Sequence, residues 1–529
     1  MLSNTLHLLM GIVVSLLTQP FYYIFLLAVL LHYRRQGILE RRLFNIRVHI
    51  YAGRVLRTVV TGLVVGVLAS LLMTGVGIHT STELLWLLGG LIVILSLFRL
   101  RLAHLLDALA LLSVLYVILS FMSGWQPVGL LGQIVAAIRN ADWVGLFTLA
   151  VLLHIAEAVL FRLQAPRLSS PIVIEGKRGK KVGAYTMDVF WPVPLWLLVP
   201  SLGGWVLPWQ PLYGGDVWSA GVALSLLPVM IGTSVLTQSE LPQVKANIIS
   251  TQLWQSSLVL IIVAVGTYWW HPLALLGIWI GVIWREYIVY KSRRQEAEQT
   301  PMYTQSLRGL RILDVIPGSP ADELGIRAAE AIFKANGVKV HSPQTLHAAL
   351  RINPAFCKLE ILNREGEIKF MQRAIYAGDH HQLGMIFVPD DDAAVTTEAQ
   401  RLNAFHLLRM PVVSRHTVRS TTVPSELDPD HIIRQSTPVV DGEPIRSRMV
   451  RNEKDNEQQQ QPPADKRQPT RPAEQPPAAK MTTTNDHAAV DHKQPASSSS
   501  AKRPSLSAQP PTDDDMTGLP KRGRKRSRR

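Results

Sequence analysis

Two residues inside an apolar run have the types and spacing for chemistry within a membrane. His154 and Glu157 stand three positions apart in LLHIAEAVLF, so a helix would place both on one face. Ionisable groups are costly in a bilayer and are often functional there. A zinc protease needs two histidines one turn apart and a general base, but Ala158 follows this pair where a second histidine is needed. We therefore expect a buried structural pair, with no catalytic residue and no metal.

Long apolar runs must carry this pair. Crossing a hydrocarbon core of roughly 30 Å takes about 20 apolar helical residues, because every backbone polar group must be satisfied within the segment. Residues 1–33 predict a broken or re-entrant hydrophobic segment, since Gln19 and Pro20 interrupt it. Residues 57–290 predict a bundle of about eight membrane helices. We place these helices near 57–78, 84–98, 105–122, 143–163, 189–208, 218–237, 252–270 and 272–290.

Lysine and arginine concentrate in alternate loops of this region. The basic loops lie at 34–57, 99–101, 167–181 and 291–294, and Lys245 precedes the seventh run, whereas the intervening loops carry only Arg139. Loops that face the cytoplasm have such an excess of positive charge. The pattern therefore predicts a multi-pass plasma-membrane protein in which everything after residue 291 faces the cytoplasm.

Residues 300–390 contain short strands, turns and two helices. The pattern I-x-x-V-x-x-x-S-P-A-x-x-x-G-I begins at Ile312, and x-I-x-x-x-N-G ends at Gly337. Over about 80 residues this segment resembles bacterial PDZ domains, which are α+β folds. One departure is Ala329-Glu330, where that family usually has Gly-Asp. The departure affects a local turn rather than the fold.

The PDZ resemblance implies a binding function for this segment. PDZ domains capture an extended peptide, often a C-terminus, by adding it as a strand to an exposed sheet edge. By resemblance, the loop Arg308-Gly309-Leu310 would bind the ligand carboxylate, and the strand from Leu310 to Asp314 would pair with the ligand. Pro343, His347 and Leu350 would line the groove from one face of a helix. Leu350 has an equally good alternative as a core residue. The implied peptide-binding residues are Arg308, Gly309, Leu310, Ile312, Pro343, His347 and Leu350.

The whole arrangement resembles one family of cell-division proteins. A broken hydrophobic segment, a basic loop, many spans and a C-terminal PDZ domain that ends in HHQLGMIFVP at 380–389 are similar to MinJ-type division topology determinants of rod-shaped Gram-positive bacteria. The resemblance covers roughly residues 1–390. It implies a scaffold that links a DivIVA-like polar scaffold to a MinD-like ATPase and restricts where the septum forms. It also implies a location at septa and poles of the bacterial cell membrane.

The end of the chain is polar. Residues 391–411 can form one short helix, and residues 412–529 predict a disordered tail, because few large apolar residues are present to offset the entropy of folding. The final cluster could bind anionic lipid or, without sequence preference, nucleic acid. A solvated tail is the simpler alternative. The cluster consists of Lys521, Arg522, Arg524, Lys525, Arg526, Arg528 and Arg529.

The expected fold class is an α-helical polytopic membrane bundle followed by an α+β PDZ domain and a disordered tail. Cys357 is the only cysteine, which excludes an intramolecular disulfide and a cysteine-based metal cluster. We expect a non-enzymatic scaffold without a cofactor. Two alternatives are an intramembrane protease with a PDZ substrate filter, which needs a complete catalytic site, and a transporter or sensor with an accessory PDZ domain, which needs a polar pathway.

Overall fold

The structure is a computed structural model of the 529-residue chain. It describes residues 2–46, 48, 50–177, 179–205, 211, 221–306, 308–374, 382–389, 395–397, 404–408 and 414–415. All of these residues belong to one compact unit, which spans 1–437. The basic cluster at 521–529 lies outside the described residues.

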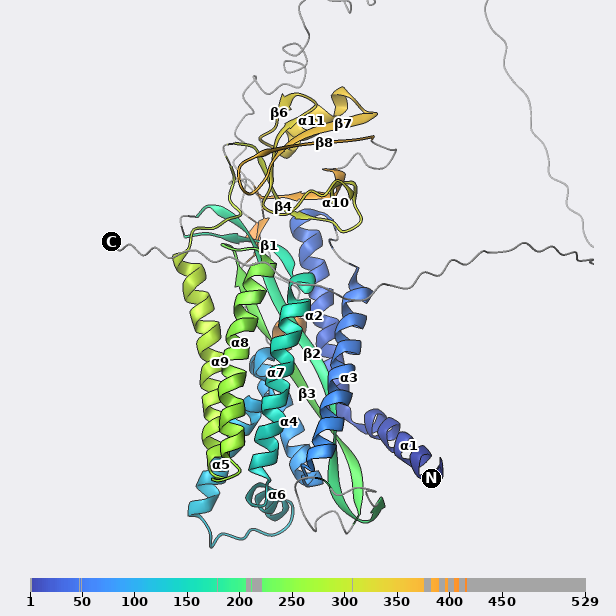
Figure 1. Cartoon of the computed structure of the whole chain (residues 1–529), viewed down its shortest axis with the longest axis vertical. Helices are drawn as coiled ribbons and strands as arrows, with labels where there is room; N and C mark the ends of the chain where they lie inside the picture. The colour runs from blue at the N-terminus through green and yellow to red at the C-terminus, as the bar shows by residue number, and fades with distance from the viewer. Residues whose placement is uncertain are drawn as a thin grey trace, which may run out of the picture. The chain divides into compact units, whose positions relative to one another are not determined.

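Five long helices, preceded by the 17-residue helix α1, form most of the N-terminal region (Figure 1). By length and composition, four of them can cross a membrane, or five crossings result if the first two helices make one bent span. The bend is 66° and occurs at Gln19, directly before Pro20, as expected where a proline begins a new helix. The helices are α1 (Leu2–Thr18), α2 (Pro20–Phe44), α3 (Tyr51–Val76), α7 (Trp143–Leu168), α8 (Pro242–Gly266) and α9 (Leu273–Glu298).

Three helices are shorter. They are α4 (Thr82–Phe98), α5 (Leu105–Phe121) and α6 (Leu130–Arg139), and the short helix η1 (Leu100–Leu102) joins the first two. A helix of 17 residues spans only about 25 Å. Arg101 of η1 pairs at 2.8 Å with Glu286, near the middle of α9, so this turn lies within the bundle. Arg101 therefore lies in the short connection between α4 and α5, where the sequence predicts a loop, but its side chain is buried.

The prediction of membrane helices at 189–208 and 218–237 is also wrong. The chain instead forms an antiparallel sheet in the order β1-β2-β3, from β1 (Ser170–Glu175), β2 (Lys181–Trp205) and β3 (Val222–Thr237). Strands β2 and β3 pair from Tyr185 opposite Thr237 to Pro200 opposite Val222. Figure 1 shows this hairpin running lengthwise among the helices. The bundle is therefore a helical shell around a long hairpin.

Polar contacts satisfy the outer edges of the hairpin. Unpaired strand edges are unfavourable at membrane depth unless the protein covers them. On β2, the carbonyl of Asp188 accepts a hydrogen bond from His32 Nε2 at 2.9 Å, and the amide of Trp196 donates to Ser70 Oγ at 2.8 Å. On β3, the side chain of Gln19 donates to the carbonyl of Leu226 at 2.8 Å. The bundle helices thus replace the neighbouring strands that this sheet lacks.

Prolines and glycines close the remaining part of the β2 edge. Pro192 and Pro194 have no amide hydrogen, so this stretch has no N–H donor to satisfy. Helix α3 packs directly on it: a Cβ added to Gly62 would lie 2.1 Å from the Pro192 carbonyl oxygen, and one added to Gly66 would lie 2.1 Å from that of Pro194. The Gly-x-x-x-Gly spacing is the close-approach motif of membrane helices. Here the two glycines of α3 pack against strand β2 instead of against a second helix.

The PDZ domain follows α9. Its sheet has the order β8-β7-β5-β4-β9, and β6 pairs with β5. Its core is apolar and contains Ile312, Ile332, Leu346, Leu359 and Met385, which are all fully buried. The elements are β4 (Leu310–Val315), α10 (Pro320–Glu323), β5 (Ala331–Ala335), β6 (Val338–Lys339), α11 (Pro343–Ile352), β7 (Phe356–Leu362), β8 (Ile368–Ala374), η3 (Gln382–Gly384) and β9 (Met385–Phe387).

Ala329 and Glu330, which replace the Gly-Asp usual in PDZ domains, still form the local turn. Ala329 has a φ of 70°, in the left-handed region that glycine adopts more easily. Glu330 is buried and accepts hydrogen bonds from the amide of Arg327 at 3.1 Å and from Lys369 Nζ at 2.5 Å. A buried carboxylate therefore still organises this turn, although the alanine carries a conformational cost.

After the PDZ domain, described parts of the chain return to the bundle. Strand β10 (Val395–Thr396) pairs with β11 (Ser414–Arg415), and the amide of Thr397 donates to the carbonyl of Val173 in β1 at 2.9 Å. Helix α12 (Ala404–Leu408) lies within the range 391–411 and buries Leu407 in the bundle core. Because β11 lies beyond residue 412, the predicted start of the disordered tail is too early.

Candidate functional site

Strand β4 is paired on both sides within the PDZ domain. Leu310 is opposite Ile332 of β5, and Ile312 is opposite Phe387 of β9. Leu310 and Ile312 are also core residues, with exposed fractions of 3% and 0%. A peptide that adds as a strand needs a free row of backbone groups. The structure therefore does not support the role that the sequence suggests for Leu310 and Ile312 in pairing with a ligand.

Strand β9 ends the sheet among the described residues and is the better edge. The amide of Val388 donates to the Arg311 carbonyl at 3.0 Å, and the Gly384 carbonyl accepts from Ile316 at 2.9 Å. Because backbone groups alternate along a strand, the amides of Met385 and Phe387 face away from β4. These outward amides form the candidate peptide-binding edge.

The segment before β9 is a tight loop. Leu383 has a φ of 51° and Gly384 a φ of 83°. A Cβ on Gly384 would lie 2.2 Å from Ser319 Cβ, so only glycine fits there without a shift. A glycine between two apolar residues directly before a strand is a signal in the sequence that could have identified this loop. The resemblance implied this role for the loop Arg308-Gly309-Leu310 instead.

The other implied residues are distributed between surface and core. Arg308 is exposed, and Gly309 lies against β5, where an added Cβ would be 2.4 Å from the Ile332 carbonyl oxygen. Pro343 and His347 are half-buried, one turn apart on α11, which contacts β5 and η3. Leu350 is buried in the PDZ core, which agrees with the alternative that the sequence left open. Helix α11 thus lies next to the loop that precedes β9.

The outer face of β4 and β9 packs against the end of the bundle that carries Tyr185. Leu313, Ile386 and Val388 form an apolar cluster with Tyr185 of β2 and Tyr303, which precedes the domain. The Tyr185 hydroxyl donates a hydrogen bond to the Leu313 carbonyl. The two tyrosine rings lie edge to face, with centroids 5.4 Å apart. These contacts hold the candidate peptide edge next to the membrane region.

Asp314 in this junction predicts a pH dependence. Burial raises the pKa of Asp314 from 3.8 to about 7, and the nearby Glu40 carboxylate adds to the increase. Because the folded protein holds this proton more tightly than the unfolded chain, the stabilising contribution is full below pH about 4 and is lost as the pH rises to about 7. We expect Asp314→Asn to stabilise the protein relative to the wild type increasingly over this range. Melting temperatures of both proteins between pH about 4 and 8 check this, and a constant difference would contradict it.

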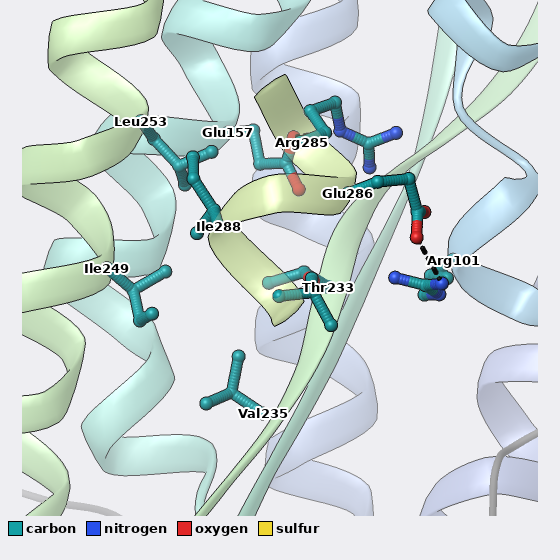
Figure 2. A pocket seen from close by; sticks show the side chains of 10 residues that line it. Arg101, Glu157, Thr233, Val235, Ile249, Leu253, Arg285, Glu286 and Ile288 are labelled. Atoms are coloured by element: carbon teal, nitrogen blue, oxygen red, sulfur yellow. Dashed lines mark hydrogen bonds and ion pairs between the residues drawn. The ribbon is translucent and has the colours of Figure 1, made fainter. Parts of the chain in front are cut away.

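A second candidate lies deep in the bundle, where α5, α7 and α9 meet. Figure 2 shows two of its residues, Glu157 and Arg285. Arg285 of α9 pairs through Nη1 with Asp107 Oδ2 at 2.6 Å and through Nε with Glu157 Oε2 at 3.6 Å. His104 Nε2 and His154 Nδ1 lie 3.5 and 3.6 Å from the same Glu157 oxygen. His154 and Glu157 are therefore adjacent and buried, but they belong to a cluster of five charged or titratable side chains.

Two histidines and a glutamate here have the composition of a metal site. Ligand atoms of His104, His154 and Glu157 all lie within 4.8 Å of one another. However, His104 Nδ1 accepts a hydrogen bond from the Leu106 amide at 3.1 Å, so the proton of the neutral ring is on Nε2, which faces Glu157. That nitrogen has no lone pair for a metal ion. This hydrogen bond therefore favours a polar contact between the Nε2–H group of His104 and the Glu157 carboxylate over binding of a metal ion.

The ion pairs of this cluster connect three helices. A cavity of about 20 Å³ lies beside Glu157 and Arg285, which is space for one water molecule. Among the described residues, neither oxygen of Glu157 has a hydrogen-bond partner, so a water molecule in this cavity would be well placed to satisfy one of them. Figure 2 also shows the neighbouring Glu286 directed at Arg101. The arrangement can hold α5, α7 and α9 together electrostatically.

Comparisons with known proteins agree with this division of the chain. A family model described as PDZ domain matches residues 311–363. The cell division topological determinant MinJ of Bacillus subtilis is 29% identical over 361 residues, which cover 68% of this chain and 90% of that protein. The probable cell division topological determinant MinJ of Lacticaseibacillus paracasei is 25% identical over 396 residues, covering 73% of this chain and all of that protein (100%).

Proposed function

We propose that this chain, which is a homologue of MinJ-type cell division topological determinants and carries a PDZ domain, is an integral membrane scaffold. In this function the PDZ domain recruits cytoplasmic proteins and thereby helps to place the division septum. The observation that carries the proposal is the end strand β9, whose outward amides of Met385 and Phe387 follow the loop at Gly384. A binding site of this type needs backbone donors and no nucleophile.

The expected ligand is an extended peptide segment of a division protein. By resemblance, the candidate partners are a DivIVA-like polar scaffold and a MinD-like ATPase. The alternate basic loops support an orientation in which the PDZ domain faces the cytoplasm, where such partners would be found. The protein would then be enriched at septa and poles of the cell membrane.

We propose further that the protein acts by binding and not as an enzyme. The hydrogen bond from the Leu106 amide to His104 disfavours a metal at the buried cluster, and Arg285 occupies both carboxylates there. The protease and transporter alternatives predict that the His154→Ala or Glu157→Gln variant loses function even when it folds normally. The scaffold proposal predicts that changes in the PDZ domain have the larger functional effect.

Imaging in dividing rod-shaped cells tests the scaffold function. We expect a fluorescent fusion at septa and poles, and we expect Gly384→Val to leave it in the membrane but remove this enrichment, with misplaced septa and longer cells. The reason is that a Cβ at Gly384 meets Ser319 and displaces the loop that precedes β9. The milder variant His347→Glu changes a half-buried side chain of α11 and should give a weaker form of the same defect.

The matched control is Gly366→Asn. Gly366 also has a positive φ, of 89°, but nothing lies within 4 Å of an added Cβ, and asparagine tolerates this conformation. Normal division in cells that carry Gly384→Val and His347→Glu would remove the proposed role of this edge. Uniform membrane fluorescence of the unmodified fusion would contradict the septum-placement function itself.

A further inference from the structure

A cavity between α2 and α3 lies apart from both sites described above. It has a volume of about 390 Å³, at the place where the charged second half of α2 lies beside the beginning of α3. A phosphate-sized group fits easily in this space. Its lining is strongly basic and also contains two tyrosines: Tyr33, Arg34, Gly37, Ile38, Glu40, Arg41, Tyr51 and Arg54.

The arginines of this cavity are of two kinds. Arg54 is buried and engaged, with Nη1 at 3.3 Å from Glu40 Oε1 and Nη2 donating to the Ser169 carbonyl at 2.8 Å. Arg34 and Arg41 are exposed and lie seven positions apart, so both face the cavity from the same side of α2. Within the described part of the chain, neither of them has an ion pair or a side-chain hydrogen bond. The positive charges of Arg34 and Arg41 are therefore available to bind an anion in the cavity.

The surroundings of the cavity indicate what kind of anion would enter. Directly before Arg34, the face of α2 carries exposed apolar side chains, including Leu27 and Leu30, and Ile50 at the start of α3 is 81% exposed. The Tyr51 hydroxyl donates to the Leu30 carbonyl at 3.1 Å and joins the two helices. Exposed apolar residues on candidate membrane helices face lipid, and tyrosine is enriched at the boundary with the headgroups. The cavity thus lies where an apolar surface changes to a basic one.

We propose that this cavity binds the phosphate headgroup of an anionic phospholipid. Arg34 and Arg41 contact the phosphate oxygens, since planar guanidinium groups match phosphate geometry with two parallel hydrogen bonds. The acyl chains follow the apolar faces of α2 and α3. Gly37 keeps the space between the two arginines open, because nothing lies within 4 Å of a Cβ added there. Basic pockets between membrane helices are suited to lipid headgroups.

Lipid retention by the full-length protein tests this site. The protein is reconstituted in phosphatidylcholine bilayers that contain phosphatidylglycerol, extracted in mild detergent and analysed by native mass spectrometry. We expect retention of one phosphatidylglycerol in preference to phosphatidylcholine. The double variant Arg34→Gln/Arg41→Gln should lose this retention by tenfold or more, as about 1 kcal/mol per arginine implies.

Gly37→Leu separates a built site from general electrostatic attraction. Leucine fills the cavity, leaves every charge in place and favours the helix, so folding is preserved. We expect it to reduce retention as much as the double arginine variant. The charge-matched control Arg42→Gln/Arg57→Gln changes two exposed arginines outside the cavity lining and should leave retention nearly unchanged.

Three results would overturn the proposal. Full retention in Gly37→Leu would show that the cavity is not the site. An equal loss in the charge-matched control would show that only the overall positive charge matters. Displacement of the lipid by millimolar inorganic phosphate would assign the cavity to a soluble phosphate compound instead.

Discussion

Arg285→Met is expected to destabilise the protein by about 3–5 kcal/mol, because it leaves two buried carboxylates without their cation. Asp107 loses its 2.6 Å contact, and Glu157 keeps only histidine neighbours. Methionine retains most of the side-chain volume, so the loss is electrostatic rather than a cavity effect. The free energy of unfolding of the purified protein in detergent measures the change.

Two further variants test this explanation. Glu157→Gln in the Arg285→Met background removes one of the unpaired charges and should recover part of the lost stability, which a double-mutant cycle quantifies. Arg294→Met breaks an exposed ion pair with Glu298 on the same helix and should change stability little. If Arg285→Met costs no more than Arg294→Met, the buried cluster does not hold α5, α7 and α9 together.

Gly62→Ala is expected to cost about 3 kcal/mol or more, since its methyl group would lie 2.1 Å from the Pro192 carbonyl oxygen. That contact requires α3 to move away from β2, which also opens the strand edge that α3 covers. Gly66→Ala should have a similar effect through Pro194. Unfolding in detergent, or the fraction of protein that reaches the membrane in a folded form, measures the loss.

Gly75→Ala is the matched control for this prediction. It introduces the same methyl group into the same helix, at a position where nothing lies within 4 Å of the new atom. Because alanine favours a helix over glycine by about 1 kcal/mol, this variant should be neutral or stabilising. If Gly62→Ala and Gly75→Ala both stabilise the protein, α3 does not pack on the hairpin as the structure has it.

The hairpin shows where hydropathy alone gives the wrong element. Residues 189–208 and 218–237 are as apolar as a membrane helix, and an apolar run without a clear period fits a buried strand as well as a helix. The discriminating signal was present: Pro192, Pro194 and Pro200 are separated by two and six residues within one run, so the backbone of all three faces the same edge of a strand. Prolines at such spacing break a helix repeatedly but are tolerated on a strand edge that donates no hydrogen bonds.

The candidate peptide site shows a different limitation. The PDZ pattern beginning at Ile312 identified the domain correctly, because the pattern consists of local turns and core positions. It did not identify the edge that can accept a peptide. That property depends on which strands are neighbours, and β4 and β9 are joined across about 70 residues of sequence.

By itself, the sequence determined the class of this protein: a membrane region with alternating basic loops, then a PDZ domain, with a long polar tail after it. These are properties of local composition and short motifs, which persist in any compact arrangement of the chain. Only the tertiary structure decided that Arg285 meets Asp107 and Glu157, and that Arg34 and Arg41 share a cavity with Arg54. Contacts of this kind join distant segments, and the packing of helices and strands selects them rather than the residues' own preferences.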